Sequence, residues 1–146
     1  MKKLSIIAVL GLLLSSCTNG EKSTTTIHVL ANKSEHEIKL QGYQWDLSIP
    51  MDTTVTISID SQIVRSVSDL GGPFSEPPFV RFKPLVVYFD DTISIQYTWN
   101  DTSAYSPLRI ENYAEDAKPG KKGGGTWKYT YTFTNRDYEE ALNKSK

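Results

Sequence analysis

The sequence is poor in the residues on which most metal and redox sites depend. Its 146 residues include one cysteine and two histidines. One cysteine cannot form an intramolecular disulfide or a cysteine-rich zinc site. The charges nearly cancel, with 16 Lys and Arg against 17 Asp and Glu, so no broad basic field is available to bind nucleic acid. The length suits one domain, and the 38% hydrophobic content suits a packed core.

Long hydrophobic runs are also missing after the first residues of the chain. The apolar run from Leu4 to Leu14 spans 11 residues, whereas a membrane-spanning helix needs about 20 residues. Lys2 and Lys3 precede this run, an order typical of a secretory signal peptide.

The segment Leu14-Ser15-Ser16-Cys17 follows the apolar run directly. It resembles the lipobox of bacterial lipoproteins, in which an apolar residue and two small residues precede a cysteine. The resemblance implies that residues 1–16 are removed and that Cys17 carries the lipid that holds the protein on a membrane. Two or three acyl chains give a stable anchor where one gives only weak binding. The alternative is an ordinary cysteine beside a plain secretory cleavage site.

The residues after Cys17 predict how the rest of the chain is organised. Residues 17–24 are small and polar, which favours a flexible tether, and residues 25–146 are expected to form a single domain. Enterobacterial lipoproteins of the inner membrane have aspartate after the cysteine, so Thr18 favours the outer membrane. Whether the domain faces the periplasm or the cell exterior stays open.

The mature chain is dominated by alternation of apolar and polar residues with a period of two, which is typical of half-buried strands. The alternating segments are 26–29, 37–41, 54–60, 92–99 and 127–134. Residues 63–67 and 79–82 are less regular candidates, and the apolar run 85–89 predicts a central or doubly buried strand. On the first strand we expect Ile27 and Val29 to face the core and His28 to face solvent.

Turns and one helix complete the expected elements. Asp90 and Asp91 predict a tight hairpin. Residues 100–125 form a long polar stretch, with a short strand expected at 108–112. Thr134-Asn135-Arg136-Asp137 matches a capping box and predicts a short helix that presents Tyr138, Ala141 and Leu142 on one face.

These patterns predict an all-β fold, an antiparallel β-sandwich of immunoglobulin-like or transthyretin-like type with a short C-terminal helix. A small β-barrel is the alternative. The opening strand with Asn32-x-Ser34, and the aromatic last strand running into residues 134–138, resemble small lipoproteins of Bacteroidota. That resemblance implies a fold and a cellular address.

Candidate catalytic and metal sites are few. His28 and His36 are expected to be two solvated histidines, since a zinc site would need carboxylates such as Glu35 or Glu37 beside them. A nucleophile elbow and an EF-hand spacing are both absent from the sequence. The Asp90-Asp91 pair suits turn chemistry. We therefore expect no catalytic residues, no metal and no cofactor.

The glycine-rich segment near the end of the chain gives no phosphate-binding signature. Gly123-Gly124-Gly125 precedes a strand and follows its lysines, the reverse of a P-loop. Lys118, Lys121, Lys122 and Lys128 are expected to be solvated, with anionic lipid or surface polysaccharide as alternative contacts.

Aromatic residues outside the strands are the remaining candidates for a binding site. Trp127, Tyr129, Tyr131 and Phe133 are expected in the core. Tyr43, Trp45, Tyr105 and Tyr113 lie in connecting segments and are candidates for a ligand or partner surface. The triplets that contain Thr53 and Thr92, each preceded by aspartate, resemble the O-glycosylation site of secreted Bacteroidota proteins.

The sequence thus predicts a lipid-anchored protein of the cell envelope that acts as a non-enzymatic binding or accessory module. Its partners would be the membrane, through the lipid on Cys17, and a second envelope protein or a glycan. The alternative is a carbohydrate-binding surface lipoprotein that uses the loop aromatics.

Overall fold

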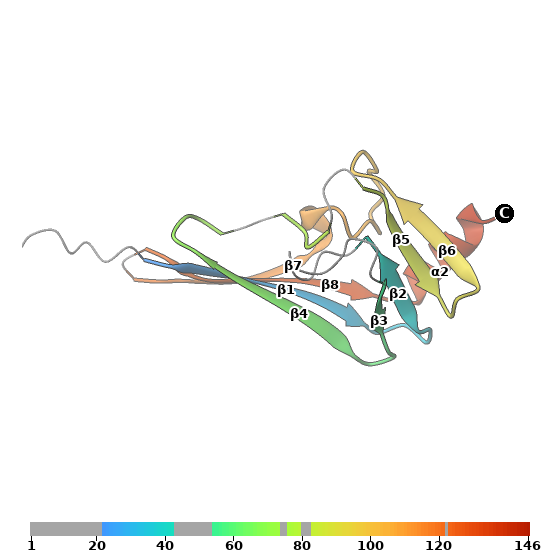
Figure 1. Cartoon of the computed structure of the whole chain (residues 1–146), viewed down its shortest axis with the longest axis horizontal. Coiled ribbons are helices and arrows are strands. Elements are labelled where there is room, and N and C mark those ends of the chain that lie inside the picture. Colours follow the sequence, from blue (N-terminus) through green and yellow to red (C-terminus); the bar gives the residue numbers. More distant parts are fainter. Residues whose placement is uncertain (1–21, 43–53, 74–75, 80–82, 122) are drawn as a thin grey trace, which may run out of the picture.

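A computed structural model of the chain describes residues 22–42, 54–73, 76–79, 83–121 and 123–146. These residues form two four-stranded β-sheets and a C-terminal helix (Figure 1). The predicted β-sandwich and C-terminal helix are confirmed, and the described strands do not close into the alternative barrel. Cys17, with the expected leader and most of the tether, lies outside the described residues.

Each sheet combines strands that are distant in the sequence. Sheet A has the order β4 (Gln62–Asp69), β1 (Thr24–Asn32), β8 (Gly125–Phe133) and β7 (Ala114–Pro119). Sheet B has the order β3 (Thr54–Ile57), β2 (Ile38–Gln41), β5 (Leu85–Phe89) and β6 (Ile93–Tyr97). Neighbouring strands are antiparallel except β1 and β8, which are parallel. No hairpin links these two strands, so nothing forces them to be antiparallel.

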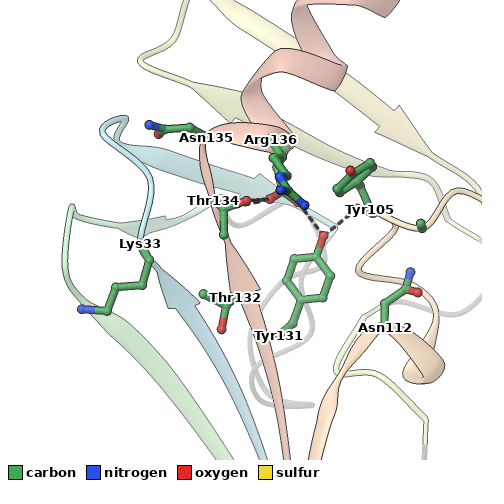
Figure 2. Close-up of a pocket in the computed structure, with 10 residues that line it drawn as sticks. Lys33, Tyr105, Asn112, Tyr131, Thr132, Thr134, Asn135 and Arg136 are labelled. Atoms are coloured by element: carbon green, nitrogen blue, oxygen red, sulfur yellow. Dashed lines mark hydrogen bonds between the residues drawn. The ribbon is translucent and has the colours of Figure 1, made fainter.

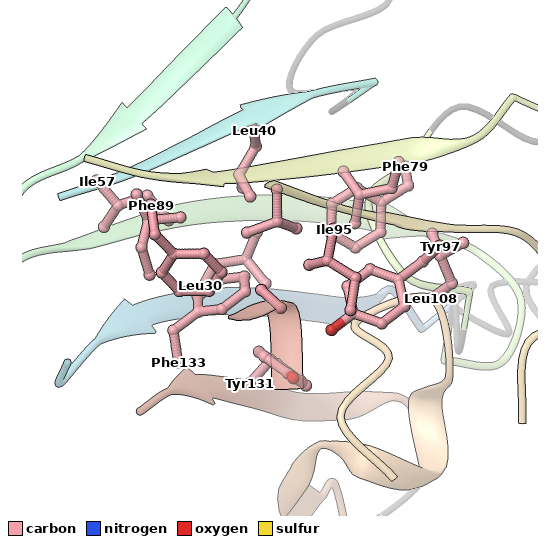
Figure 3. Packing of buried hydrophobic residues seen from close by; sticks show 14 of the residues in the cluster. Leu30, Leu40, Ile57, Phe79, Phe89, Ile95, Tyr97, Leu108, Tyr131 and Phe133 are labelled. Carbon is pink, nitrogen blue, oxygen red and sulfur yellow. The ribbon is translucent and has the colours of Figure 1, made fainter. Parts of the chain in front are cut away.

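The core lies where sheet B covers one end of sheet A. It contains residues of both sheets and of the connecting segments (Figure 3), among them Leu30, Leu40, Ile57, Phe79, Phe89, Ile95, Tyr97, Leu108, Tyr131 and Phe133. The expected burial of the β8 aromatics is confirmed, with Trp127 only partly buried. The other end of sheet A extends beyond sheet B as a long ribbon (Figure 1). The sandwich therefore has a packed end and an extended end.

The prediction of which face of β1 points to the core is wrong. His28 has a relative exposure of 1%, and it lies on the same side of the strand as Leu30, which is part of the core. The period of two gives two faces but does not say which is inner, and β1 carries apolar residues on both. Because β1 lies between β4 and β8, Val29 on the other face is also buried.

The segments that connect the strands agree only in part with the predictions from the sequence. Asp90 and Asp91 have φ values of 50° and 59°, as a type I′ hairpin turn requires, so the predicted tight turn is confirmed. The strand expected at 108–112 is wrong, because Ile110–Asn112 form the 3-10 helix η1. Strand β7 follows it, and all six of its side chains are exposed. An exposed edge strand shows no apolar alternation, which is why the sequence did not predict it.

Helix α2 (Asn135–Lys144) begins where the capping box predicts. The Asp137 carboxylate oxygen Oδ2 accepts hydrogen bonds from the Thr134 backbone N–H at 2.8 Å and from its hydroxyl at 2.9 Å. Ala141 is fully buried, with Tyr138 and Leu142 half-buried beside it, so the predicted apolar face is confirmed. The helix packs against β6 at the packed end of the sandwich.

Candidate functional site

The structure separates the residues that the sequence proposed for a ligand surface. Tyr43, Trp45 and Thr53 lie outside the described residues. Tyr113 is buried, with 7% relative exposure, and its hydroxyl donates a hydrogen bond to the Pro107 carbonyl at 2.8 Å. The prediction that Tyr113 is a surface residue is wrong. It holds the loop that precedes it.

Thr92 follows the β5–β6 turn and is exposed. Its hydroxyl donates a hydrogen bond of 3.3 Å to the Phe89 carbonyl. The glycosylation expectation for this residue stays a prediction.

Tyr105 is the remaining candidate, and it lies at an open hollow between the 101–113 segment, the end of β8 and the start of α2 (Figure 2). The hollow has a volume of about 420 Å³. Its lining residues are Lys33, Ala104, Tyr105, Asn112, Tyr131, Thr132, Thr134, Asn135, Arg136 and Asp137. In Figure 2 Lys33 and Asn112 lie on opposite sides of Tyr131.

Strand pairing at the end of β1 brings Lys33 to this hollow. The Lys33 backbone N–H donates to the Phe133 carbonyl at 2.8 Å, so the residue after β1 lies beside the end of β8. Asn32, fully buried, fixes the turn that follows. Its amide donates to the His36 and Ile57 carbonyls at 2.8 and 3.0 Å, and its Oδ1 accepts from the Ser34 hydroxyl at 2.7 Å. The predicted turn after β1 is therefore a rigid wall of the site.

Hydrogen bonds also fix the 101–113 segment against the helix. Ser103 donates its hydroxyl to the Glu140 carboxylate at 2.7 Å, and the Asn112 amide donates to the Ser103 and Ser106 carbonyls at 3.1 and 2.9 Å. Tyr105 is held in place between these anchors. The long polar stretch that the sequence left undefined is thus ordered by polar contacts.

The phenol of Tyr131 forms the floor of the hollow. Its oxygen lies 2.6 Å from the Tyr105 carbonyl and 2.6 Å from Oδ1 of Asp137, with one proton to donate. Burial, together with the Asp137 carboxylate, raises the pKa of Tyr131 well above its ordinary value. The phenol therefore stays neutral and positions its neighbours.

The charged rim of the hollow is basic. The Lys33 ammonium pairs with Asp60 at 2.9 Å, and both side chains are exposed. Arg136 is exposed and makes no ion pair with any residue that the structure describes. A guanidinium with free donors in a polar hollow suits hydroxyl or carboxylate groups of a ligand.

A second open hollow, of about 450 Å³, adjoins the first. Tyr105 and Arg136 line both, and the second also contains Glu139, Glu140, Asn143 and Lys144 of α2. Tyr105 and Arg136 therefore stand at the boundary between two polar recesses. We call the two recesses together the Tyr105–Arg136 site.

Neither histidine lines the Tyr105–Arg136 site. His36 lies 2.6 Å from the Asp90 carboxylate and stacks on Tyr138 at 3.8 Å between ring centres. The hydrogen bond from His36, with the Glu37 backbone N–H, lowers the pKa of Asp90. His28 stacks on Tyr129, and neither of its ring nitrogens has a hydrogen-bond partner among the described residues. The prediction of two solvated histidines is wrong for His28.

Two wider searches of the described residues find neither a metal-binding group nor a membrane-spanning helix. Among the residues that the structure describes, no group of three or more His, Cys, Asp or Glu side chains is arranged to hold a metal ion. In the same part of the chain, no helix has the length and apolar character needed to cross a membrane.

Comparisons with known proteins add little. No family model matches the chain, and no curated protein matches it in sequence. The chain is similar to a solved structure described as the dioxygenase domain of a dioxygenase and carbohydrate-binding protein fusion from Streptomyces sp. SirexAA-E. The two have 9% identity and a TM-score of 0.30, over 80% of this chain and 82% of the other. A similarity of this size carries no argument about activity.

Proposed function

We propose that the protein is a lipid-anchored module of the cell envelope, at the outer membrane, that binds a ligand or partner without catalysing a reaction. The Tyr105–Arg136 site is its binding surface. One observation supports this arrangement above the others. Strand β1 begins beside the predicted tether and ends at the site.

The length of β1 sets the distance between anchor and site. The strand runs from Thr24 to Asn32, and Lys33 follows at the rim of the hollow. At about 3.3 Å per residue, the chain rises about 30 Å from Thr24 to Lys33. A lipid on Cys17 would therefore hold the extended end of the sandwich at the membrane and present the site on the far end.

The chemistry of the site favours binding over catalysis. Its polar groups are an arginine, a lysine, amides and hydroxyls, which recognise a polar ligand by hydrogen bonds. Its buried carboxylate, Asp137, accepts hydrogen bonds from Thr134 and Tyr131 and so shapes the floor. That role is structural.

Carbohydrate is the ligand class that one specific observation favours. Tyr105 offers an aromatic ring where two polar recesses meet, and Arg136 stands beside it in both. Sugar rings stack on aromatic side chains while their hydroxyls or carboxylates bind the surrounding donors. An oligosaccharide with acidic units would contact both recesses at once. A protein partner of the envelope is the alternative occupant.

The anchor is tested by protease treatment of intact cells that produce the natural protein or the Cys17→Ala variant. We expect the natural protein to fractionate with the outer membrane and the variant to lose lipid and membrane attachment. Digestion on intact cells indicates the exterior, whereas digestion only after opening of the outer membrane indicates the periplasm. Unchanged processing and attachment of the Cys17→Ala variant would contradict the proposed anchor.

The site is tested by titration of neutral and uronic acid oligosaccharides, followed by calorimetry. Tyr105→Ala and Arg136→Ala should each weaken binding by about tenfold, the loss expected for one stacking or charge-assisted contact. Tyr88→Ala is the matched control, because Tyr88 is a half-exposed tyrosine on β5 that lines a separate open hollow of about 430 Å³ on sheet B. Binding that survives both site variants and is lost in the control would contradict the assignment.

A further inference from the structure

The tip of the β7–β8 hairpin packs directly against the start of the described chain. The parallel register pairs Thr24 with Gly125, and the antiparallel register pairs Pro119 with the same glycine. An ideal Cβ on Gly124, whose φ is +67°, would lie 2.6 Å from the Ser23 carbonyl oxygen. Only glycine permits this approach. The chain therefore enters the domain in contact with the hairpin tip.

Basic side chains gather at this tip. Lys22, Lys118 and Lys121 are exposed, and none of them forms an ion pair with a described residue. On β7, Asp116 lies two residues before Lys118 and opposite Lys128 of β8, and at the end of β4 the acidic residue in register with Thr24 is Asp69. Its Oδ1 accepts a hydrogen bond of 2.6 Å from the Leu70 backbone N–H. The tip is therefore basic, in a chain with a net charge of −1.

An exposed apolar residue lies at the same end of sheet A. Leu70, directly after β4, has a relative exposure of 63%, the largest among the exposed large hydrophobic residues that the structure describes. Lysines beside an exposed leucine are the combination that binds the interface of an anionic bilayer.

The predicted anchor brings this tip within electrostatic range of a membrane. Cys17 and Lys22 are five residues apart in the sequence, and five residues span at most about 18 Å at full extension. Screening in physiological salt limits the attraction to about 8 Å, and a segment of at most about 18 Å allows the tip to come within that distance of the headgroups without any change in the domain. Lys144 and Lys146 are at the opposite, packed end of the molecule (Figure 1).

We propose that the tip formed by Lys22, Lys118, Lys121 and Leu70 contacts the anionic phospholipid headgroups of the bilayer that holds the Cys17 lipid. This inference rests on the proposed lipid anchor. The contact directs the strands of sheet A away from the membrane surface, so that the Tyr105–Arg136 site lies at the end of the domain far from the membrane. The contact therefore fixes one orientation of the domain relative to the membrane.

Lysine acetylation of the purified, lipidated full chain tests this contact. The chain is placed in vesicles of phosphatidylcholine alone or of phosphatidylcholine with phosphatidylglycerol, and each lysine is followed by mass spectrometry. Lys118 and Lys121 should react about fivefold more slowly in the anionic vesicles, the factor expected for one basic group at such a surface. Added salt should abolish the difference. Lys146, at the far end, should react equally in both.

Two double variants of equal charge give the matched comparison. In Lys118→Gln with Lys121→Gln, the protection of Lys22 by anionic vesicles should be lost. In Lys144→Gln with Lys146→Gln it should persist. A lipidated chain whose Lys118 and Lys121 react equally fast in both vesicles overturns the tip contact alone. A chain whose Cys17 peptide carries no lipid overturns the anchor and the tip contact together.

Discussion

Tyr131 on β8 and Asp137 on α2 are joined by a buried hydrogen bond of 2.6 Å between the phenol oxygen and Oδ1. The same phenol lies 2.6 Å from the Tyr105 carbonyl. One side chain therefore ties the last strand, the C-terminal helix and the 101–113 segment together at the floor of the site.

Tyr131→Phe should lower the free energy of unfolding by about 1–3 kcal/mol, because it leaves the buried Asp137 oxygen and the Tyr105 carbonyl without this donor. Urea unfolding measures the loss. Tyr88→Phe is the control, since its exposed hydroxyl donates only to Gln41, and it should change stability by less than about 0.5 kcal/mol. Equal effects of the two variants would contradict the role assigned to Tyr131.

Asn32→Ala should destabilise the fold by about 3 kcal/mol, since it removes the amide that satisfies the buried Ile57 carbonyl, the partly buried His36 carbonyl and the Ser34 hydroxyl. Asn100→Ala, at an exposed asparagine, should have an effect within about 0.5 kcal/mol. Chemical denaturation of both variants checks the difference. A small effect at Asn32 would mean that water replaces its hydrogen bonds without penalty.

Gly42→Ala should destabilise the protein by about 1–3 kcal/mol because Gly42 has a φ of +99° and an ideal Cβ there would lie 2.8 Å from the Pro84 carbonyl oxygen. Gly71→Ala meets nothing within 4 Å and has no positive φ, so it should be neutral or slightly stabilising. Thermal unfolding of the pair measures both. Equal melting temperatures would contradict the strain at Gly42.

Stability should fall on acidification between pH 6.5 and 4 because of His28. Burial, and then the nearby Arg65 charge, lower the pKa of His28 to about 4 from an ordinary value of 6.5. The unfolded chain therefore binds a proton in this range that the folded chain excludes, so unfolding becomes easier as the pH falls. The full difference corresponds to about 3 kcal/mol, reached below pH 4.

The groups around His28 in sheet A are Arg65 on β4, Tyr129 on β8 and, beyond Tyr129 in the register, Glu115 on β7. His28→Leu should flatten the pH dependence in this range, as measured by urea unfolding at several pH values. His36→Gln, which leaves His28 in place, should retain the slope that His28 causes. A slope that persists in His28→Leu would assign the effect to other groups.

The sequence predicted the strands whose two faces differ. Ile38 and Leu40 on β2, and Ile95 and Tyr97 on β6, alternate with polar residues and are buried as the pattern requires. The alternation with a period of two failed to predict strands whose two faces have similar surroundings. The sequence of β7 has no apolar face because both faces are exposed, and β1 is central, so the position of His28 did not follow from alternation.

The sequence identified one residue of the candidate site but did not predict the site as a whole. An aromatic in a polar segment pointed to Tyr105, but the same reasoning applied equally to Tyr113, which a hydrogen bond within the loop turns inward. Lys33 and Arg136 gave no local signal. They meet because the end of β1 pairs with the end of β8, a contact between residues about 100 positions apart, which no short-range pattern encodes.

The parallel pairing of β1 with β8 also determines when the domain can form. Thr24 pairs with Gly125 and Asn32 with Phe133, so the middle of sheet A joins the first described strand to the last. Contacts of such long range are late and slow in folding, because the whole intervening chain must be brought together first. Until β8 has been synthesised, β1 lacks its parallel neighbour, and the nascent chain has no complete sheet A to collapse upon. The domain therefore cannot complete sheet A until its C-terminal strand β8 is present.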